Sequence, residues 1–423
     1  MSPTTMDPKD LEAFVRALPK TDLHLHLDGS LRLRSLIELA REHAVELPSY
    51  TEAGLIETVF KPRYRNLPEY LEGFRYTCAV LQTAEALERA TYELCADCRA
   101  EGVDYVEIRF APQLHVHGKL TLRDVARAVG RGIARAEKDF RGDDGPGARP
   151  PFRAGVIFCA LRYFNEFFGE EYRRLSDVHQ FSAPEEIFAY ASLELARAAG
   201  RLRYEEGLPI VGFDLAGQEK GYPASQHRRA YQAAHEAFLG KTVHAGEDYG
   251  PESIFQAIGD CHADRIGHGT WLFDASKVGP RVKDPEAYVS RLAQYVADRR
   301  ITIEVCLTSN QQTVPELADD LRRHPFAEMR KRRLSTTFCT DNRLVSSTTV
   351  TREILRAVEA FALHPSEIRD VLIYGFKRSF FPGSYLEKRA YVRRVIDFAD
   401  AQFDAFFPRA RTGLHRRKEE PED

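Results

Sequence analysis

Eight short runs typical of buried β-strands alternate along this chain with longer segments of helical periodicity. The runs are rich in Val, Ile, Phe and Thr and are largely apolar, as expected of parallel strands covered on both faces. They cover Thr21–Leu27, Asp104–Ala111, Phe152–Leu161, Pro209–Leu215, Lys241–Ala245, Arg265–His268, Ile301–Thr308 and Leu334–Thr340. Eight strands alternating with helices predict an α/β protein with a (β/α)8 barrel, also called a TIM barrel.

Three regions depart from a minimal barrel. Residues 45–103 form a long helical excursion after the first run, and Tyr163–Ile187 is an aromatic and charged insertion after the third. Arg411–Asp423 is a charged tail that we expect to be disordered. The sequence therefore predicts one barrel domain over residues 1–410, followed by a tail over residues 411–423.

Charge and hydropathy argue against several partners. The formal net charge of -3 gives no general attraction to nucleic acid or to an anionic membrane. No apolar run approaches the ~20 residues needed to span a bilayer, and the first ten residues lack the apolar core of a signal peptide. Seven scattered cysteines indicate reduced thiols rather than a disulfide framework. We expect a cytoplasmic enzyme that acts on a small molecule, with an oligomeric state that the sequence leaves open.

Histidine and aspartate residues gather where four of these runs end. His24 and His26 alternate on one strand, so both side chains point to the same face, which is the interior of a barrel. His244 lies at the end of the fifth run, and Asp341 directly follows the eighth. Any one of these histidines alone would be interpreted as a hydrogen-bonded core residue. Together, three imidazoles and one carboxylate predict a zinc site at the carboxyl ends of the strands.

Two further residues of this region suit proton transfer. Glu247 lies three residues after His244, in a strand-to-loop turn where its side chain can face a substrate. A carboxylic acid in a dry pocket has a raised pKa and can donate a proton near neutral pH. His268, between two glycines, can take a proton from an attacking water or orient it. The alternatives are a surface glutamate and a hydrogen-bonded barrel histidine.

The chain resembles the adenosine deaminase family in six segments that occur in the family's order. They are TDLHLHLDGS, YVEIRFAP, GFDLAG, KTVHAGE, RIGHGT and TDN, spanning residues 21–342. The resemblance implies a (β/α)8 barrel of the metal-dependent amidohydrolase superfamily with one zinc ion per chain. It also implies hydrolysis of adenosine or deoxyadenosine to inosine or deoxyinosine plus ammonia, a reaction of purine nucleoside salvage.

The same resemblance implies a role for each matching residue. The zinc ligands would be His24, His26, His244 and Asp341, with His26 also against the substrate. Glu247 matches the acid that protonates purine N1, and His268 matches the residue that positions and activates the attacking hydroxide. Gly217 matches the backbone N–H donor to N3, and Asp28 matches the residue that binds the ribose 5′-hydroxyl.

One matched position departs from the family pattern. Asn342 stands where many members have a second Asp that contacts purine N7. Because N7 is an acceptor, that Asp must be protonated to donate, whereas an Asn amide donates without any change of protonation. We therefore expect Asn342 to bind the substrate and purine recognition to be retained.

Several alternatives remain open. The segment His26-Leu27-Asp28-Gly29 stands where adenine deaminases of this family have a segment similar to His-Ile-Glu-Gly. Because Asp28 is shorter than that Glu, it leaves room for a ribose, which favours a nucleoside over a free base. The insertion at Tyr163–Ile187 can reshape the mouth of the pocket. A decorated 6-aminopurine nucleoside, such as aminodeoxyfutalosine, is therefore an alternative substrate. AMP is less favoured, because the matched segments contain no basic cluster for a phosphate.

A dinuclear hydrolase would need a bridging Lys at the end of the fourth run, but Lys220 lies too far along. A non-catalytic binding protein on the same barrel is expected to have lost some of the predicted metal ligands or proton-transfer residues, but all of them are present in this chain.

Overall fold

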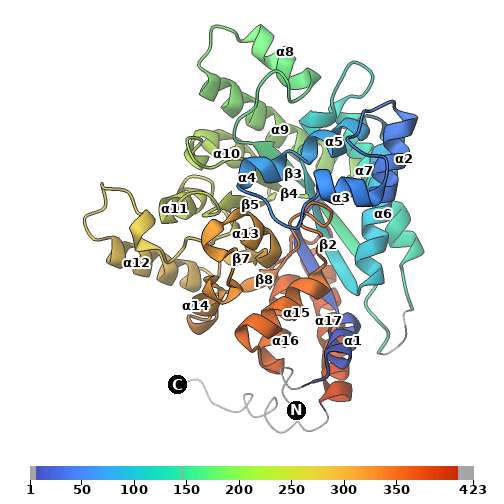
Figure 1. Ribbon diagram of the computed structural model, residues 1–423, viewed down its shortest axis with the longest axis vertical. Coiled ribbons are helices and arrows are strands. Elements are labelled where there is room, and N and C mark those ends of the chain that lie inside the picture. Colours follow the sequence, from blue (N-terminus) through green and yellow to red (C-terminus); the bar gives the residue numbers. More distant parts are fainter. Residues whose placement is uncertain (1–5, 144, 146, 408–423) are drawn as a thin grey trace.

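The computed structural model describes residues 6–143, 145 and 147–407, and it contains the predicted barrel (Figure 1). Eight parallel strands pair in chain order from β1 to β8. The ring is nearly closed by a parallel bridge between Leu25 and Asp341. The strands are β1 (Lys20–His26), β2 (Val103–Phe110), β3 (Arg153–Leu161), β4 (Ile210–Ala216), β5 (Gly240–Ala245), β6 (Arg265–His268), β7 (Thr302–Val305) and β8 (Thr336–Phe338).

The predicted strand over Ile301–Thr308 is wrong at its carboxyl end. The chain leaves β7 after Val305, and helix α13 (Leu307–Thr313) begins two residues later. The apolar composition of this run did not distinguish strand from buried helix, because both are covered on all sides. The early turn has a structural consequence, since it brings Ser309 and Asn310 to the mouth of the barrel, where both contact predicted site residues.

Helices surround the strands (Figure 1). The first half of the chain contributes α1 (Pro8–Ala17), α2 (Leu33–Glu42), α3 (Glu52–Thr58), α4 (Leu67–Leu71), α5 (Phe74–Val80), α6 (Ala84–Ala100), α7 (Leu122–Asp139), α8 (Glu170–Val178) and α9 (Pro184–Glu206). The second half contributes α10 (Arg228–Glu236), α11 (Pro251–Gly259), α12 (Pro285–Asp298), α13 (Leu307–Thr313), α14 (Phe326–Lys331), α15 (Val350–Phe361), α16 (Pro365–Arg378) and α17 (Tyr385–Phe406). Single 3-10 turns lie at Pro112–His115, Ala224–His227, Ala275–Lys277, Pro315–Leu317 and Leu321–Arg323.

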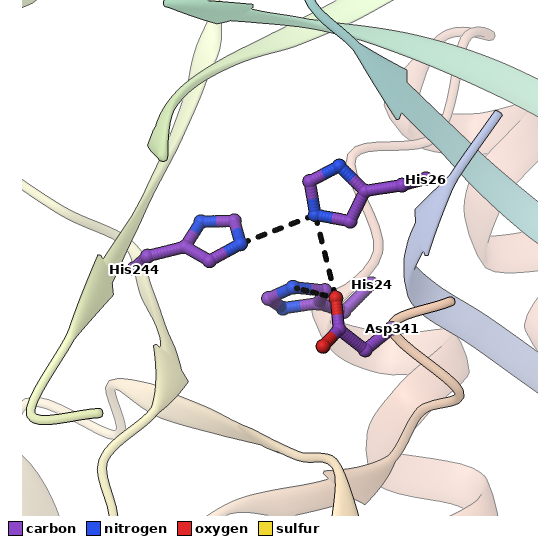
Figure 2. Close-up of side chains that lie close together, drawn as sticks. All are labelled: His24, His26, His244 and Asp341. Atoms are coloured by element: carbon purple, nitrogen blue, oxygen red, sulfur yellow. Dashed lines mark hydrogen bonds and ion pairs between the residues drawn. The ribbon is translucent and has the colours of Figure 1, made fainter. Parts of the chain in front are cut away.

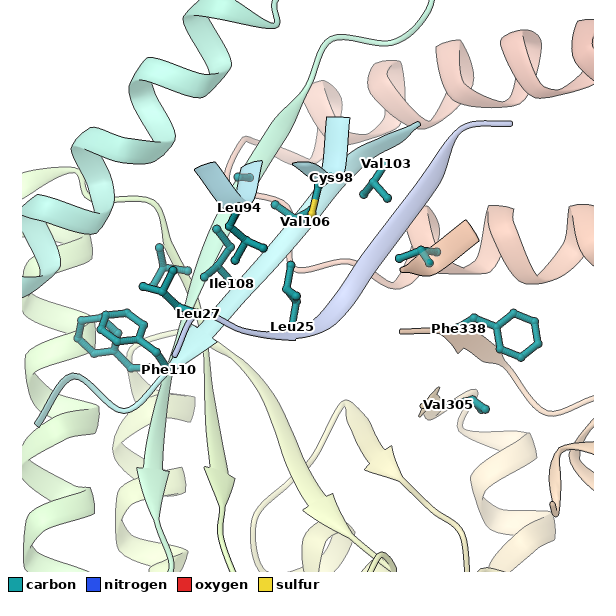
Figure 3. Packing of buried hydrophobic residues seen from close by; sticks show 14 of the residues in the cluster. Leu25, Leu27, Leu94, Cys98, Val103, Val106, Ile108, Phe110, Val305 and Phe338 are labelled. Carbon is teal, nitrogen blue, oxygen red and sulfur yellow. The ribbon is translucent and has the colours of Figure 1, made fainter. Parts of the chain in front are cut away.

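The core lies between the strands and these helices. Figure 3 shows Leu94 and Cys98 of α6 packed over Val106 and Ile108 of β2, with Leu25 of β1 beside them. All five side chains are almost completely buried. Fully burying a side chain of the size of Leu or Ile stabilises the folded state by about 1.5–3 kcal/mol. This packing makes the strands a rigid support for the residues at their ends.

The two regions beyond a minimal barrel are both folded. The excursion over residues 45–103 forms α3 to α6, in which Cys95 and Cys98 are buried helix residues with free thiols. The insertion after β3 forms a loop followed by α8, which lies at the upper edge of the molecule in Figure 1. The predicted tail over Arg411–Asp423 lies outside the described residues. Within the described ranges, no helix is both long and apolar enough to cross a bilayer.

Candidate active site

Four side chains converge at the carboxyl ends of the strands (Figure 2). His24 and His26 come from β1, His244 from β5 and Asp341 from the segment just after β8. One potential ligand atom of each lies within 4.8 Å of those of the other three. The sequence-predicted ligand set is therefore brought together, although its members span residues 24 to 341.

The donor chemistry of this cluster fits a metal ion. His26 Nε2 and His244 Nε2 are 3.2 Å apart, and His26 Nε2 lies 3.5 Å from Asp341 Oδ1. His24 Nε2 is buried, lies 3.4 Å from Asp341 Oδ1 and makes no hydrogen bond to a described residue. Burial and the nearby imidazoles hold the pKa of His26 well below its usual range, and the neutral imidazole is the form that binds metals. A cation at this point would satisfy all of these nitrogen and oxygen atoms at once.

The outer nitrogens of two of these histidines contact buried carboxylates. His24 Nδ1 is 2.8 Å from Glu304 Oε2, and His244 Nδ1 is 3.1 Å from Asp214 Oδ2. A carboxylate on Nδ1 keeps the proton on that nitrogen and leaves Nε2 free to bind a metal. Asp214 was part of the matched GFDLAG segment without an assigned role, and Glu304 was missed.

Arg109 joins the two carboxylates. Its guanidinium donates to Asp214 at 2.9 Å and to Glu304 at 2.9 Å, and all three side chains are fully buried. Isolated buried charges are costly, so this pairing, together with the 2.6 Å contact of Arg265 Nε with Glu304 Oε1, offsets the cost of two carboxylates inside the barrel. A charged residue within an otherwise apolar strand is the signal that could have identified Arg109 in VEIRFA and Glu304 in TIEV.

Glu247 and His268 lie at the same mouth. His268 Nε2 is 3.6 Å from Glu247 Oε2, and together with Asp341 they form a second close group of potential ligands. Burial and the neighbouring carboxylates of Asp341 and Glu219 raise the pKa of Glu247 well above its usual range. His268 and Asp341 have φ angles of 66° and 61°, in the left-handed region that non-glycine residues seldom adopt. Strain of this kind concentrates at functional sites, where the surrounding structure holds it in place.

A chain of hydrogen bonds determines which nitrogen of His268 carries the proton. The Phe326 N–H donates to His324 Nδ1 at 3.1 Å, and burial lowers the pKa of His324 to about 3, so His324 is neutral with its proton on Nε2. His324 Nε2 lies 3.1 Å from Asn310 Oδ1, and Asn310 Nδ2 lies 3.0 Å from His268 Nδ1. His268 Nδ1 is thus the acceptor, and its Nε2–H faces the cavity. Sequence analysis missed Asn310 and His324.

A cavity of about 460 Å³ covers this cluster. Every predicted site residue lines it except His24, which is buried. Its outer part is lined mainly by apolar and aromatic side chains of α4, α5 and the insertion after β3, among them Leu71, Phe74, Tyr163, Phe167 and Phe168. Of the described residues that line the cavity, Arg75 is the single Lys or Arg.

The three remaining predicted residues also lie in this cavity. Burial raises the pKa of Asp28 to about 7, and Asp28 Oδ1 lacks a hydrogen-bond partner in the described part of the chain. Gly217 has a φ of 100°, a conformation that favours glycine. Asn342 Nδ2 donates to the Tyr70 hydroxyl at 2.8 Å, which leaves one amide hydrogen for a ligand. A Cβ atom on Gly29 would lie 1.8 Å from Asn342 Oδ1, so this glycine of the TDLHLHLDGS segment makes room for the amide.

Comparisons with known proteins give a consistent result. A family model described as adenosine deaminase matches residues 19–398. An adenosine deaminase from Mycobacteroides abscessus is 38% identical over 392 residues, covering 92% of this chain and 96% of that protein. An adenosine deaminase 1 from Streptomyces coelicolor is 37% identical over 385 residues, covering 90% and 87%.

Solved structures share the fold. An adenine deaminase from Arthrobacter aurescens superposes with a TM-score of 0.70 at 23% identity, covering 90% of this chain and 99% of the other. An amidohydrolase from Burkholderia ambifaria with bound zinc superposes with a TM-score of 0.72 at 18% identity, covering 96% and 97%. At such identities the superpositions establish the barrel architecture alone.

Proposed function

Because this chain belongs to the adenosine deaminase family, we propose that it hydrolyses adenosine or deoxyadenosine to inosine or deoxyinosine and ammonia. The observation that carries the proposal is the convergence in one cavity of a four-residue metal-ligand set with Glu247 and His268. Relatives named adenosine deaminase match nearly the whole chain, which supports the same reaction.

We propose one zinc ion per chain, held by His24, His26, His244 and Asp341. Three imidazoles and a carboxylate suit zinc, and the buried carboxylates on two of the histidines support this ligand geometry. Zinc in such a site acts as a Lewis acid that allows water to act as a nucleophile near neutral pH.

The residues of the chain would then perform the proton transfers and the positioning. Glu247 donates a proton to purine N1, which makes C6 more electrophilic toward water. The water oxygen bonds to C6, one water proton passes to the C6 amine, the C6–N bond breaks with release of ammonia, and the other water proton returns to the Glu247 carboxylate. His268 orients the attacking water, because its Nε2–H faces the cavity while Nδ1 accepts from Asn310. The Gly217 N–H and one Asn342 amide hydrogen bind the purine at N3 and N7.

The chemistry of the cavity favours a nucleoside without a phosphate. The buried Asp28 carboxylate is suited to the ribose 5′-hydroxyl, because one of its oxygens lacks a partner among the described residues. A phosphate would meet a single Arg and a largely apolar outer cavity. A second candidate follows from the insertion after β3. A nucleoside with an aromatic 5′-substituent could pack against Phe167 and Phe168, which line the cavity; Phe167 is 87% exposed.

The test is a comparison of initial rates of ammonia release from adenosine, deoxyadenosine, adenine, AMP and aminodeoxyfutalosine. We expect the two unsubstituted nucleosides to have the highest kcat/KM. Metal-loaded Glu247→Gln protein, prepared identically, controls for contaminating deaminases. A higher kcat/KM for aminodeoxyfutalosine would support the second candidate, whereas a preference for AMP or free adenine would contradict both.

A further inference from the structure

We propose that Glu219 is a positioning residue for this reaction. Its buried carboxylate holds the loop after β5 in the conformation that directs Glu247 into the cavity. The inference rests on the proposed function, because it takes Glu247 as the proton donor. Glu219 lies in the loop after β4, three residues beyond Ala216, and it was not among the residues singled out from the sequence.

The Glu219 carboxylate accepts four hydrogen bonds from one short segment. Its Oε2 atom accepts from the backbone N–H of Gly246 at 3.2 Å, the N–H of Tyr249 at 3.0 Å and the hydroxyl of Ser253 at 3.1 Å. Its Oε1 atom accepts from the N–H of Glu247 itself at 3.3 Å. The donors cover the loop between β5 and α11 and the first turn of α11, so one side chain holds the whole segment.

Two further hydrogen bonds hold the backbone carbonyls of the same segment. The Glu247 carbonyl accepts from Trp271 Nε1 at 2.8 Å, and the His244 carbonyl accepts from the buried Arg162 guanidinium at 2.5 Å. Glu247 is thus anchored at both its N–H and its C=O. Two fixed peptide planes determine the direction of the Cα–Cβ bond, and hence the point from which the Glu247 side chain extends into the cavity.

A carboxylate is the side chain that suits this position. It has two acceptor oxygens and no proton to donate, so both oxygens can face N–H groups. Glutamine would replace one oxygen by an NH₂ group and set donors against donors in a buried site. Glu219 is 4% exposed, so water has little access to replace the lost hydrogen bonds. The loop in Glu219→Gln is therefore expected to shift, and Glu247 with it.

The first test is steady-state kinetics of Glu219→Gln with metal content held equal. A misplacement of about 1 Å can cost 10²-fold in rate, so we expect kcat to fall by roughly 10- to 100-fold. We expect KM to stay within about threefold, because the other substrate contacts remain in place. Glu137→Gln is the matched control: Glu137 is a largely buried carboxylate that accepts from the Ala154 N–H at the opposite end of β3, and its removal should leave kcat unchanged. A normal kcat in Glu219→Gln would overturn the proposal.

The second test asks whether Glu219 acts through Glu247. In a double-mutant cycle, Glu219→Gln should have little further effect on kcat in a Glu247→Gln background, because the group being positioned can no longer donate its proton. A general loss of structure would instead reduce the residual activity by the same factor in both backgrounds. Additive effects in the cycle would therefore overturn the proposal.

A third test does not require activity. Amide hydrogen exchange over residues 246–249 should be faster in Glu219→Gln, while exchange over β2 and β3 should match the wild type. Unchanged exchange in the loop would overturn the proposal. If the wild type releases no ammonia from any 6-aminopurine, the proposed function fails, and this measurement still decides whether Glu219 holds the loop.

If Glu219→Gln does not fold, Ser253→Ala removes a single contact to Glu219, and its kcat should fall roughly two- to tenfold. An unchanged kcat in Ser253→Ala would count against the proposal.

Discussion

Glu247 is the residue on which the proposed chemistry depends most directly. Its side chain is about 10% exposed and lies 3.6 Å from His268. Glutamine has nearly the same shape but cannot deliver a proton to N1, and losing a general acid typically costs ~10²–10⁴-fold in rate. We expect Glu247→Gln to keep its metal and its fold while kcat falls by that factor. Near-normal turnover in a metal-loaded sample would remove Glu247 from the mechanism.

Asn342 tests the purine-binding end of the cavity. One of its amide hydrogens is bound to Tyr70, and the second is free to donate to N7. We expect 7-deazaadenosine to have a lower kcat/KM than adenosine in the wild type, by roughly fivefold for a hydrogen bond of ~1 kcal/mol. In Asn342→Ala the same change of substrate should matter little, because the donor is gone. The measurement is a double cycle over two enzymes and two substrates, and additivity would show that Asn342 does not contact N7.

At the scale of elements, helix α13 follows a strand that ends earlier than the sequence indicated. β7 ends at Val305, and the first turn of α13 directs Ser309 to Asp341 at 2.6 Å and Asn310 to His268 at 3.0 Å. The helix thus provides outer contacts to a predicted metal ligand and to a predicted catalytic residue. In an extended strand, neighbouring residues point to opposite faces. If the strand continued through this segment, Ser309 and Asn310 could not both point into the barrel and make these two contacts.

Asn310 provides the test of this element. Asn310→Asp keeps the size of the side chain but presents only acceptors, so His268 would carry its proton on Nδ1 and lose the Nε2–H that faces the cavity. Outer contacts of this kind typically contribute 10–100-fold, and we expect kcat to fall within that range in Asn310→Asp and Asn310→Ala. Gln311→Ala is the control on the same helix, because Gln311 contacts Ala318 and Arg356 rather than site residues. Wild-type kcat in Asn310→Asp would contradict the tautomer assigned to His268.

At the scale of the whole molecule, the metal ligands connect opposite parts of the ring. β1, β5 and the segment after β8 each contribute, so a bound ion would join the first strand, the middle and the end of the barrel. A ligand that binds only the folded state stabilises it by RT ln(1 + [L]/Kd), which is about 4 kcal/mol when free metal exceeds Kd 1,000-fold. The barrel core does not depend on the ion, so the metal-free protein should remain folded.

We therefore expect removal of the metal by a chelator to lower Tm by several degrees and re-addition of zinc to restore it. The measurement is thermal unfolding followed by circular dichroism, together with metal analysis, for which we expect one zinc per chain. His26→Ala should show no zinc-dependent change in Tm. Two ions per active chain, or the same Tm with and without metal, would contradict the proposed centre.

The expected domain organisation also belongs to this scale. If residues 1–410 form a single domain, thermal unfolding should follow one cooperative transition by both circular dichroism and tryptophan fluorescence. Deleting residues 411–423 should leave Tm and kcat unchanged. Two separated transitions, or a lower Tm after the deletion, would show that the chain is organised differently.

The fold and the grouping of His24, His26, His244 and Asp341 were predictable because local rules determine both; that the four bind a metal stays a prediction. Buried strands and amphipathic helices have distinct periodicities, and their alternation is enough to predict the barrel. His24 and His26 share a face because successive side chains of a strand point to opposite faces, so residues two apart point the same way. His244 and Asp341 lie near the carboxyl ends of strands, which a barrel brings together. The roles of Asp28, Gly217 and Asn342 came from the family resemblance and stay predictions until the variants are measured.

The tertiary structure decided which charged residues support that site. Arg109 bridges Asp214 and Glu304, Glu219 holds the loop of Glu247, and His324 acts on His268 through Asn310. Each of these interactions joins residues from different strands, helices or loops at hydrogen-bond distance. No periodicity encodes such a contact, because its length and direction depend on how whole elements pack and where each one ends. The sequence by itself therefore determined that His24, His26, His244 and Asp341 reach the mouth of the barrel. Only packing decided which partners hold the site residues there, because those contacts depend on where each element ends.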